Sequence, residues 1–185
     1  RIKGFHAYPR GATMKHMRES SNLALLVGRQ NKSTTIDSFY VTSMISEMKC
    51  AERTIQSYHF PLYVYADQGS LGDRAERIPN FSPEILEKIA DAIRLTFTNE
   101  KEETDGTFAP IDLLDYIYGV LHSPSYREKY KEFLKIDFPR VPYPKDAATF
   151  WELVALGGEL RQIHLLESPK VEQFITRFPV GGDNV

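Results

Sequence analysis

The sequence predicts a mixed α+β fold, with a small β-sheet and short helices in the N-terminal part and a helical C-terminal part packed against them. Short runs of strand-forming residues fall within the first 65 residues, whereas longer runs with helical spacing of apolar residues follow residue 80. At 185 residues with 42% hydrophobic content, the chain can bury a substantial core. We therefore expect one compact unit with a basic β-rich part over residues 1–66 and a mainly helical part over residues 67–185.

Three segments of the N-terminal part are expected to be strands. Residues 23–27 form a continuous apolar run, as expected of a strand that is buried on both faces. Residues 39–42 are rich in β-forming side chains. Residues 62–65 alternate after Pro61, and a proline at that position favours the start of a strand or the edge of a sheet. The stretch between the last two, residues 44–53, fits either a short helix or a strand.

A short amphipathic helical turn is expected before the first strand, between Thr13 and Arg18. Its methionines can face the interior, while Lys15, His16 and Arg18 remain exposed. Residues 66–80 contain two glycines and several polar residues, so they are expected to form a loop and the boundary between the two parts.

The C-terminal part is expected to begin and end with a helix. Ser82 as N-cap and Pro83 in the first turn open a helix that runs to about Leu95. The polar and acidic residues 98–107 are expected to form a connector. A last helix is expected over residues 147–166.

The central stretch, residues 108–143, is expected to form two short helices and an extended exit. Pro110 suits the first turn of the first helix, and Ser123 and Pro124 end that helix and open the second. Three prolines within six residues require the exit at 137–144 to be extended. The apolar residues that we expect to be buried together are Leu121, Phe133 and Leu134.

Charge is unevenly distributed along the chain. Residues 1–35 hold seven lysines and arginines against Glu19, a balance of +6, while the whole chain has a formal net charge of −2. The remaining 150 residues therefore sum to about −8. A basic segment on an acidic body can confine the binding of a polyanion to one face. The alternative is a chance cluster of charges on a solvated surface.

One long stretch carries a resemblance to a known protein family, DYIYGVLHSPSYREKYKEFLKIDFPRVP at residues 115–142. Further segments follow the same order as in that family: HMRESSNLALLVGRQ at 16–30, FPLYVY at 60–65, PNFSPEILEKI at 79–89 and FWELVALGGELRQIHLL at 150–166. Together they resemble the C-terminal specificity region of large bacterial adenine-specific DNA methyltransferases. The similarity is greatest to the single-chain, ATP-dependent Type ISP restriction-modification enzymes, and it spans most of the chain.

The resemblance implies a sequence-specific DNA-binding module for target recognition. Its partners would be double-stranded DNA and the methyltransferase, nuclease or translocase domains of the same polypeptide. S-adenosylmethionine would be bound by the methyltransferase domain, and this chain would be a non-catalytic fragment that holds no cofactor. The alternative is a structural module that docks on the methyltransferase core without contacting DNA. Salt-dependent binding to duplex DNA would distinguish the two.

The candidate DNA-binding residues come from the basic segment and from the exit of the first strand. Arg29, Gln30 and Asn31 follow the apolar run, and such side chains can read base edges, since Arg matches guanine and Gln or Asn matches adenine. For His16, a phosphate contact and simple exposure both remain open. The candidates are Arg10, Lys15, His16, Arg18, Arg29, Gln30, Asn31 and Lys32.

Motifs for catalysis are absent from the sequence. The chain has neither the glycine-rich loop nor the Asn-Pro-Pro-Tyr-type tetrapeptide of adenine methyltransferases, and it has no Gly-x-x-x-x-Gly-Lys-Ser/Thr loop for phosphates. The single Cys50 has no partner for a zinc knuckle, and the five histidines are never closer than ten residues. We therefore expect no catalytic, cofactor-binding or metal-binding residues. The lone cysteine and the absence of an apolar run of eighteen residues fit a cytoplasmic protein.

Overall fold

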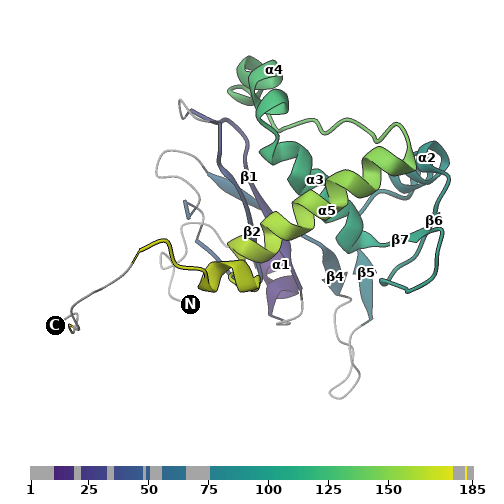
Figure 1. Cartoon of the computed structure of the whole chain (residues 1–185), viewed down its shortest axis with the longest axis horizontal. Coiled ribbons are helices and arrows are strands. Elements are labelled where there is room, and N and C mark those ends of the chain that lie inside the picture. Colours follow the sequence, from purple (N-terminus) through teal and green to yellow (C-terminus); the bar gives the residue numbers. More distant parts are fainter. Residues whose placement is uncertain are drawn as a thin grey trace.

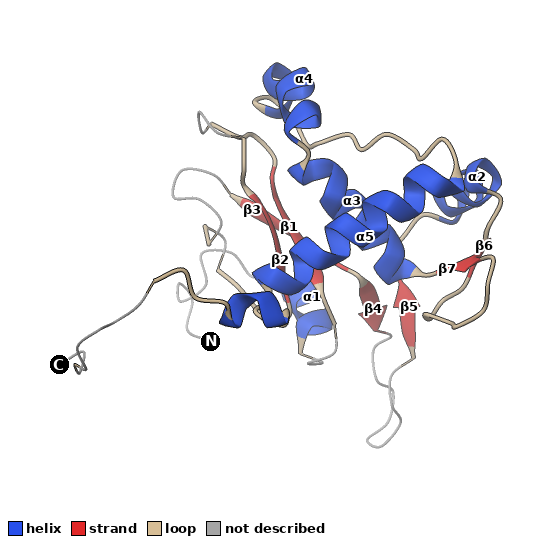
Figure 2. Ribbon diagram, viewed as in Figure 1, coloured by secondary structure: helices blue, strands red, loops and turns tan. Residues whose placement is uncertain are grey.

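The computed structural model describes residues 11–18, 22–32, 36–47, 49–50, 56–65, 76–176 and 182. Within these residues a small sheet packs against helix α3 (Pro110–His122), and helix α5 (Ala147–His164) crosses α3 and reaches the sheet (Figure 1). Strands come mainly from the first half of the chain and the longer helices from the second half (Figure 2). The expected mixed α+β fold is confirmed.

Strand β1 is the centre of a three-stranded antiparallel sheet. It spans Ala24–Gly28 and lies between β2 (Phe39–Thr42) and β3 (Ser57–Pro61). Every residue of β1 is buried, as its apolar run predicts. The strands expected at 23–27 and 39–42 are therefore confirmed.

Strand β3 is not predicted from the sequence. Its residues Ser57 and His59 are polar and buried, so no apolar run marks the segment, and pairing of its backbone with β1 makes it a strand. Pro61 ends β3, and because β3 is an edge strand, the missing N–H of the proline removes no bond from the interior of the sheet.

A second sheet of two strands follows directly. Strand β4 (Tyr63–Tyr65) confirms the strand expected at 62–65, and it pairs antiparallel with β5 (Arg77–Pro79). The expected loop at 66–80 thus ends in a strand, because Arg77 to Pro79 find a backbone partner in β4. Residues 66–75 lie outside the described part of the chain.

Two further stretches were expected to be irregular or ambiguous. Of residues 44–53, those that the structure describes (44–47 and 49–50) form neither helix nor strand. The polar connector at 98–107 is flanked by β6 (Thr96–Phe97) and β7 (Thr107–Phe108), which pair in parallel. Its last residue therefore belongs to a strand, since the connector folds back and brings the two short segments together.

Helices α2 and α4 begin directly after the serines that we expected at their N-termini. Helix α2 (Pro83–Ile93) follows Ser82, which stands at the N-cap position but makes no side-chain capping bond. Helix α4 (Pro124–Leu134) follows Ser123, whose Oγ accepts a hydrogen bond from the Tyr126 N–H. Helix α5 follows Asp146, whose Oδ1 accepts from the Thr149 N–H at 2.8 Å. The residues after α4, 138–144, form neither helix nor strand, which agrees with the expected exit. The remaining helices are short: α1 (Gly11–Met14), η1 (Lys15–Met17) and η2 (Pro169–Glu172).

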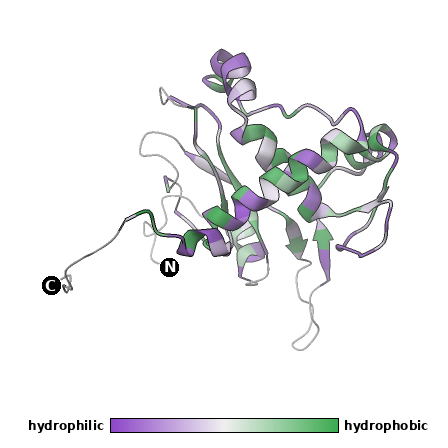
Figure 3. Cartoon of the chain, viewed as in Figure 1, coloured by the Kyte–Doolittle hydropathy of each residue, from purple (hydrophilic) through white to green (hydrophobic). Residues whose placement is uncertain are grey.

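Burial differs between the central helices. Figure 3 shows many hydrophobic residues along α3 and α5, whereas α4 is mainly hydrophilic. Leu121 of α3 is 0% exposed and Leu134 of α4 is 2% exposed, as predicted. Phe133 is only half-buried, because it lies at the margin of the body with the Arg140 guanidinium 5.0 Å from the centre of its ring.

Helices α3 and α5 cross where two glycines bring their backbones into contact. A Cβ atom on Gly157 would overlap the carbonyl oxygen of Asp115, and one on Gly119 would lie 2.8 Å from the carbonyl oxygen of Leu153. Beside the crossing, Arg161 donates from Nε and Nη2 to the two carboxylate oxygens of Asp115 at 2.6 and 3.1 Å. Burial raises the pKa of Asp115, and the hydrogen bonds from Arg161 oppose that shift.

We expect Gly157→Ala to lower the free energy of unfolding of the domain by about 1 to 3 kcal/mol or more, because the new methyl group can fit only if the two helices move apart. Chemical denaturation of the purified domain measures the change. Gly11→Ala is the matched control, since a Cβ there meets nothing within 4 Å. Equal stability of the two variants would contradict the described crossing.

A cluster of polar side chains joins the end of α3 to its neighbours. The Nε2 of His122 lies 3.2 Å from the Phe39 carbonyl oxygen and donates to it, while the Nδ1 of His122 accepts from Nη2 of Arg127 at 2.6 Å. The hydroxyl of Tyr118 lies 2.6 Å from Nδ1 of His164. Burial, together with the charge of Arg127 and the neighbouring His164, lowers the pKa of His122 to about 4. The imidazole of His122 is therefore neutral at pH 7.

Because the pKa of His122 is about 6.5 in the unfolded chain and about 4 in the folded domain, the unfolded state binds more protons between these values. We expect stability to be complete above pH 6.5 and to fall as the pH drops towards 4, by on the order of 1 to 2 kcal/mol after allowance for partial exposure. Denaturation midpoints of the wild type and of His122→Gln, measured from pH 7.5 to pH 4, should therefore converge as the pH falls. Parallel curves would show that His122 does not titrate in this way.

Candidate nucleic-acid interface

The structure separates the candidate residues into two groups at opposite ends of β1. Arg10 lies outside the described residues. Lys15, His16 and Arg18 precede the start of β1, beside β4, and the other candidates follow its end, beside α4. Figure 1 shows α1 at the lower end of the sheet and α4 at the upper end. The basic residues of this segment that the structure describes therefore do not form one continuous patch. Whether these residues bind DNA stays a prediction.

At the lower end, His16 is buried and not exposed as expected. Its Nδ1 accepts a hydrogen bond from the Tyr65 N–H at 3.0 Å, and the side-chain amide of Asn22 donates to the carbonyl oxygens of His16 and Tyr63 at 2.8 and 2.9 Å. These bonds hold η1 against β4, so the His16 ring has a structural role. Arg18 is exposed and Lys15 is half-buried.

At the upper end, the loop after β1 is held on the end of α4. The backbone N–H of Asn31 donates to the Leu134 carbonyl oxygen at 3.0 Å, and Asn31 is only 2% exposed. The side chain of Asn31 is thus turned inward and does not present donors to the surface, contrary to expectation. Arg29, Gln30 and Lys32 are exposed.

The loop after β1 lies beside the exit of α4, and the two segments together form one charged surface. Arg29 donates from Nε to Oδ1 of Asp137 at 3.4 Å, although the two residues are 108 positions apart in sequence. The pKa of Asp137 is below its usual value because its carboxylate accepts from the backbone of Phe138, and Arg29 and Arg140 add to the shift. We call the following set the β1-exit surface: Arg29, Gln30, Lys32, Lys135, Asp137, Phe138 and Arg140.

Sequence reasoning missed the α4 contribution to this surface. Lys135 bonds Oε1 of Glu132 at 2.6 Å, and Arg140 is exposed over the Phe133 ring. The one local indication of this contribution in the sequence was the presence of basic residues beside the proline-rich exit. Nothing near them in sequence indicates that they meet the exit of β1.

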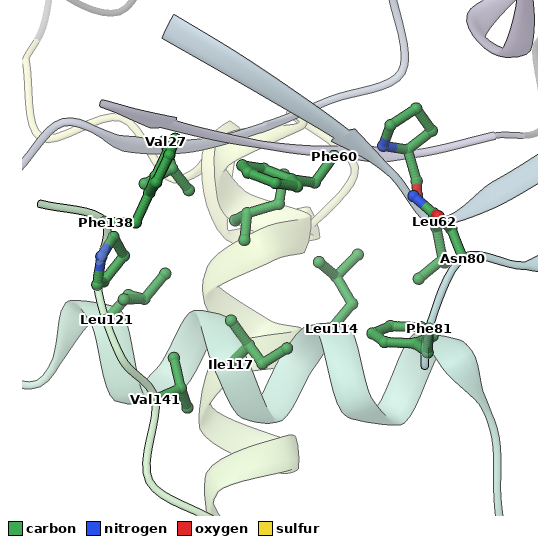
Figure 4. A pocket seen from close by; sticks show the side chains of 13 residues that line it. Val27, Phe60, Leu62, Asn80, Phe81, Leu114, Ile117, Leu121, Phe138 and Val141 are labelled. Carbon is green, nitrogen blue, oxygen red and sulfur yellow. The ribbon is translucent and has the colours of Figure 1, made fainter. Parts of the chain in front are cut away.

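An apolar pocket of about 450 Å³ lies between the sheet and α3 (Figure 4). It is lined by Leu25, Val27, Phe60, Pro61, Leu62, Asn80, Phe81, Leu114, Ile117, Leu121, Phe138, Pro139 and Val141. No lining residue carries an acidic or basic group, so the pocket has no side chain for proton transfer. Phe138 forms part of its wall and also supports Arg29 at the surface, with the guanidinium carbon 5.8 Å from the centre of the ring.

Among the described residues, no group of three or more His, Cys, Asp or Glu side chains could hold a metal ion. No helix in the same part of the chain has the length and apolar character needed to cross a membrane.

Comparison with known proteins identifies the family. A sequence model of the Type ISP C-terminal specificity domain matches residues 3–185. The fold is similar to part of the ATP-dependent Type ISP restriction-modification enzyme LlaBIII bound to DNA, with a TM-score of 0.60 and 22% identity over 78% of this chain and 8% of that one. It is also similar to part of the DrdV–DNA complex determined by cryo-electron microscopy, with a TM-score of 0.53 and 25% identity over 78% of this chain and 12% of that one.

The chain spans only about a tenth of the length of these two proteins. No curated protein matches it. The family model covers all but the first two residues, and the chain therefore belongs to the family of Type ISP C-terminal specificity domains.

Proposed function

We propose that this domain recognises a target sequence in double-stranded DNA on behalf of a larger restriction-modification polypeptide. The observation that carries the proposal is the β1-exit surface, where exposed Arg, Gln and Lys side chains from two distant segments meet. Membership of the specificity-domain family supports it. The LlaBIII and DrdV structures are both DNA complexes, which agrees with the proposal.

The residues of the β1-exit surface divide by chemistry. Lys32 and Arg140 are exposed cations, and Lys135 is a half-buried one. All three suit phosphate contacts, which position a protein on DNA without reading sequence. Arg29 and Gln30 carry donors that match guanine and adenine edges in the major groove. Lys15 and Arg18, at the other end of β1, would contact the backbone separately.

The remaining activities belong to the rest of the polypeptide. A methyltransferase domain upstream would bind S-adenosylmethionine and transfer the methyl group, and a nuclease or translocase would act on the same DNA. The domain itself would be non-catalytic, with residues 1–66 and 67–185 acting as one unit. The sequence supports this view, since it lacks the methyl-donor loop, the tetrapeptide for the target amine and the phosphate-binding loop.

We expect Lys32→Ala and Arg140→Ala, made in the full-length protein, to weaken binding to all duplexes alike. Each lost phosphate contact should lower the slope of log affinity against log salt by about one, because fewer counterions are released. Lys15→Ala and Arg18→Ala test the other end of β1 in the same way. The measurement is a salt titration of binding to several unrelated duplexes.

Lys88→Ala is the matched control, because Lys88 is exposed on α2, away from β1 and α4 (Figure 1). If the control changes the salt slope as much as the test variants do, the charge effect is not local and the assigned surface is wrong. If none of the variants changes DNA binding, the domain acts as a docking module for the methyltransferase core.

We also expect the isolated domain to transfer no methyl group, cleave no DNA and hydrolyse no ATP, because the motifs for these reactions are missing from its sequence. Incubation with duplex DNA and radiolabelled S-adenosylmethionine measures the first activity most sensitively. Label in the DNA above the level of a no-protein control would refute the expectation.

A further inference from the structure

The structure holds Arg29 in a way that bears on base recognition, and the inference rests on the proposed function. We propose that Asp137 is a positioning residue: together with Phe138, it holds the Arg29 guanidinium so that its two terminal NH₂ groups face outward to read a guanine. Asp137 would then influence base preference at one position of the target without itself touching DNA.

The contacts of Arg29 occupy one edge and one face of its guanidinium. Nε donates to Oδ1 of Asp137 at 3.4 Å, and the planar group lies 5.8 Å from the centre of the Phe138 ring. The side chain of Arg29 nevertheless stays 57% exposed. Within the described part of the chain, no acceptor contacts its Nη1 or Nη2 groups.

Both supports of Arg29 are themselves fixed. The backbone N–H of Asp137 donates to the Phe133 carbonyl oxygen at 3.1 Å, and its carboxylate accepts from the Phe138 backbone. The Phe138 ring packs edge-on against Tyr58 and Phe60 of β3, at centroid distances of 4.9 and 5.9 Å. The guanidinium is thus held by a segment that is anchored to both α4 and the sheet.

This arrangement selects one mode of hydrogen bonding. With Nε directed at Asp137, the guanidinium can present Nη1 and Nη2 end-on, and two parallel N–H donors match O6 and N7 of guanine. Adenine offers N7 beside an amino donor, so it would satisfy only one of the two groups. A lysine carries no planar fork and could not keep both the carboxylate bond and the paired donors.

An ordinary surface ion pair is the competing explanation, because exposed pairs contribute little to stability and many have no function. The two explanations differ in what they predict. If Asp137 only neutralises charge, its removal raises affinity for every duplex equally. If it positions Arg29, its removal changes preference at one base position, whatever happens to overall affinity.

The test uses the full-length protein and a library of duplexes with a randomised central segment. Bound duplexes are sequenced for the wild type, Arg29→Lys, Asp137→Ala and Asp137→Asn. The matched control is Glu132→Ala, which removes another exposed, ion-paired carboxylate near the same surface. Denaturation midpoints confirm that each variant folds.

We expect the wild type to select guanine at one position. Arg29→Lys should reduce that preference by about five-fold to a hundred-fold, the discrimination typical of one bidentate base contact. Asp137→Ala should weaken preference at the same position and no other, and Asp137→Asn, which keeps an acceptor oxygen, should restore part of it. Glu132→Ala should leave the preference unchanged. Replacing the selected guanine by 7-deazaguanine should weaken binding of the wild type more than that of Arg29→Lys, which lacks the paired donors.

Three results would overturn the inference. The first is an unchanged base preference in Asp137→Ala, and the second is an equal loss of preference in Glu132→Ala. The third is a selected site in which no guanine preference is reduced by Arg29→Lys. In these cases the domain still reads DNA, and the proposed function stands. If the wild type selects no sequence and shows no salt-dependent duplex binding, both the inference and the proposed function fail.

Discussion

The close crossing of α3 and α5 is the constraint on which the rest of the structure depends. Backbones can approach this closely only where side chains are absent, and Gly119 and Gly157 meet that need on the two helices. The crossing brings Asp115 and Arg161 together, both largely buried, with two hydrogen bonds between them. Removing either partner of such a pair would leave an uncompensated buried charge, so both residues are needed where the helices cross.

The end of α3 positions the β1-exit surface through a short series of contacts. The end of α3 is bound to β2 through His122 and the Phe39 carbonyl oxygen, and Arg127 of α4 bonds both His122 and the Leu121 carbonyl oxygen. These bonds set the direction in which α4 leaves α3. The far end of α4 then receives the loop after β1. A surface assembled in this way moves with the helices, so its geometry depends on core packing as well as on its own residues.

Net charge alone describes this surface poorly. The described cations of the first 35 residues are divided between the two ends of β1. At one end they lie beside Arg140, which comes from after α4. His16 and Asn31, which the sequence predicts to contact DNA, are instead buried: the His16 ring accepts a hydrogen bond from the Tyr65 N–H, and Asn31 is only 2% exposed. A polar residue beside a cationic run can thus be a structural anchor, and burial decides between the two roles.

The sequence by itself determined the features that act over a few residues. The helix starts after Ser82 and Ser123, the burial of β1 and the non-helical exit after α4 follow from capping, apolar patterning and proline geometry within one or two turns. Tertiary structure alone decided that β3 and β5 are strands, that His16 and Asn31 are buried, and that Arg29 meets Asp137. The physical reason is that these features depend on partners far away in sequence. A local pattern contains no information about which distant backbone or carboxylate will lie beside it.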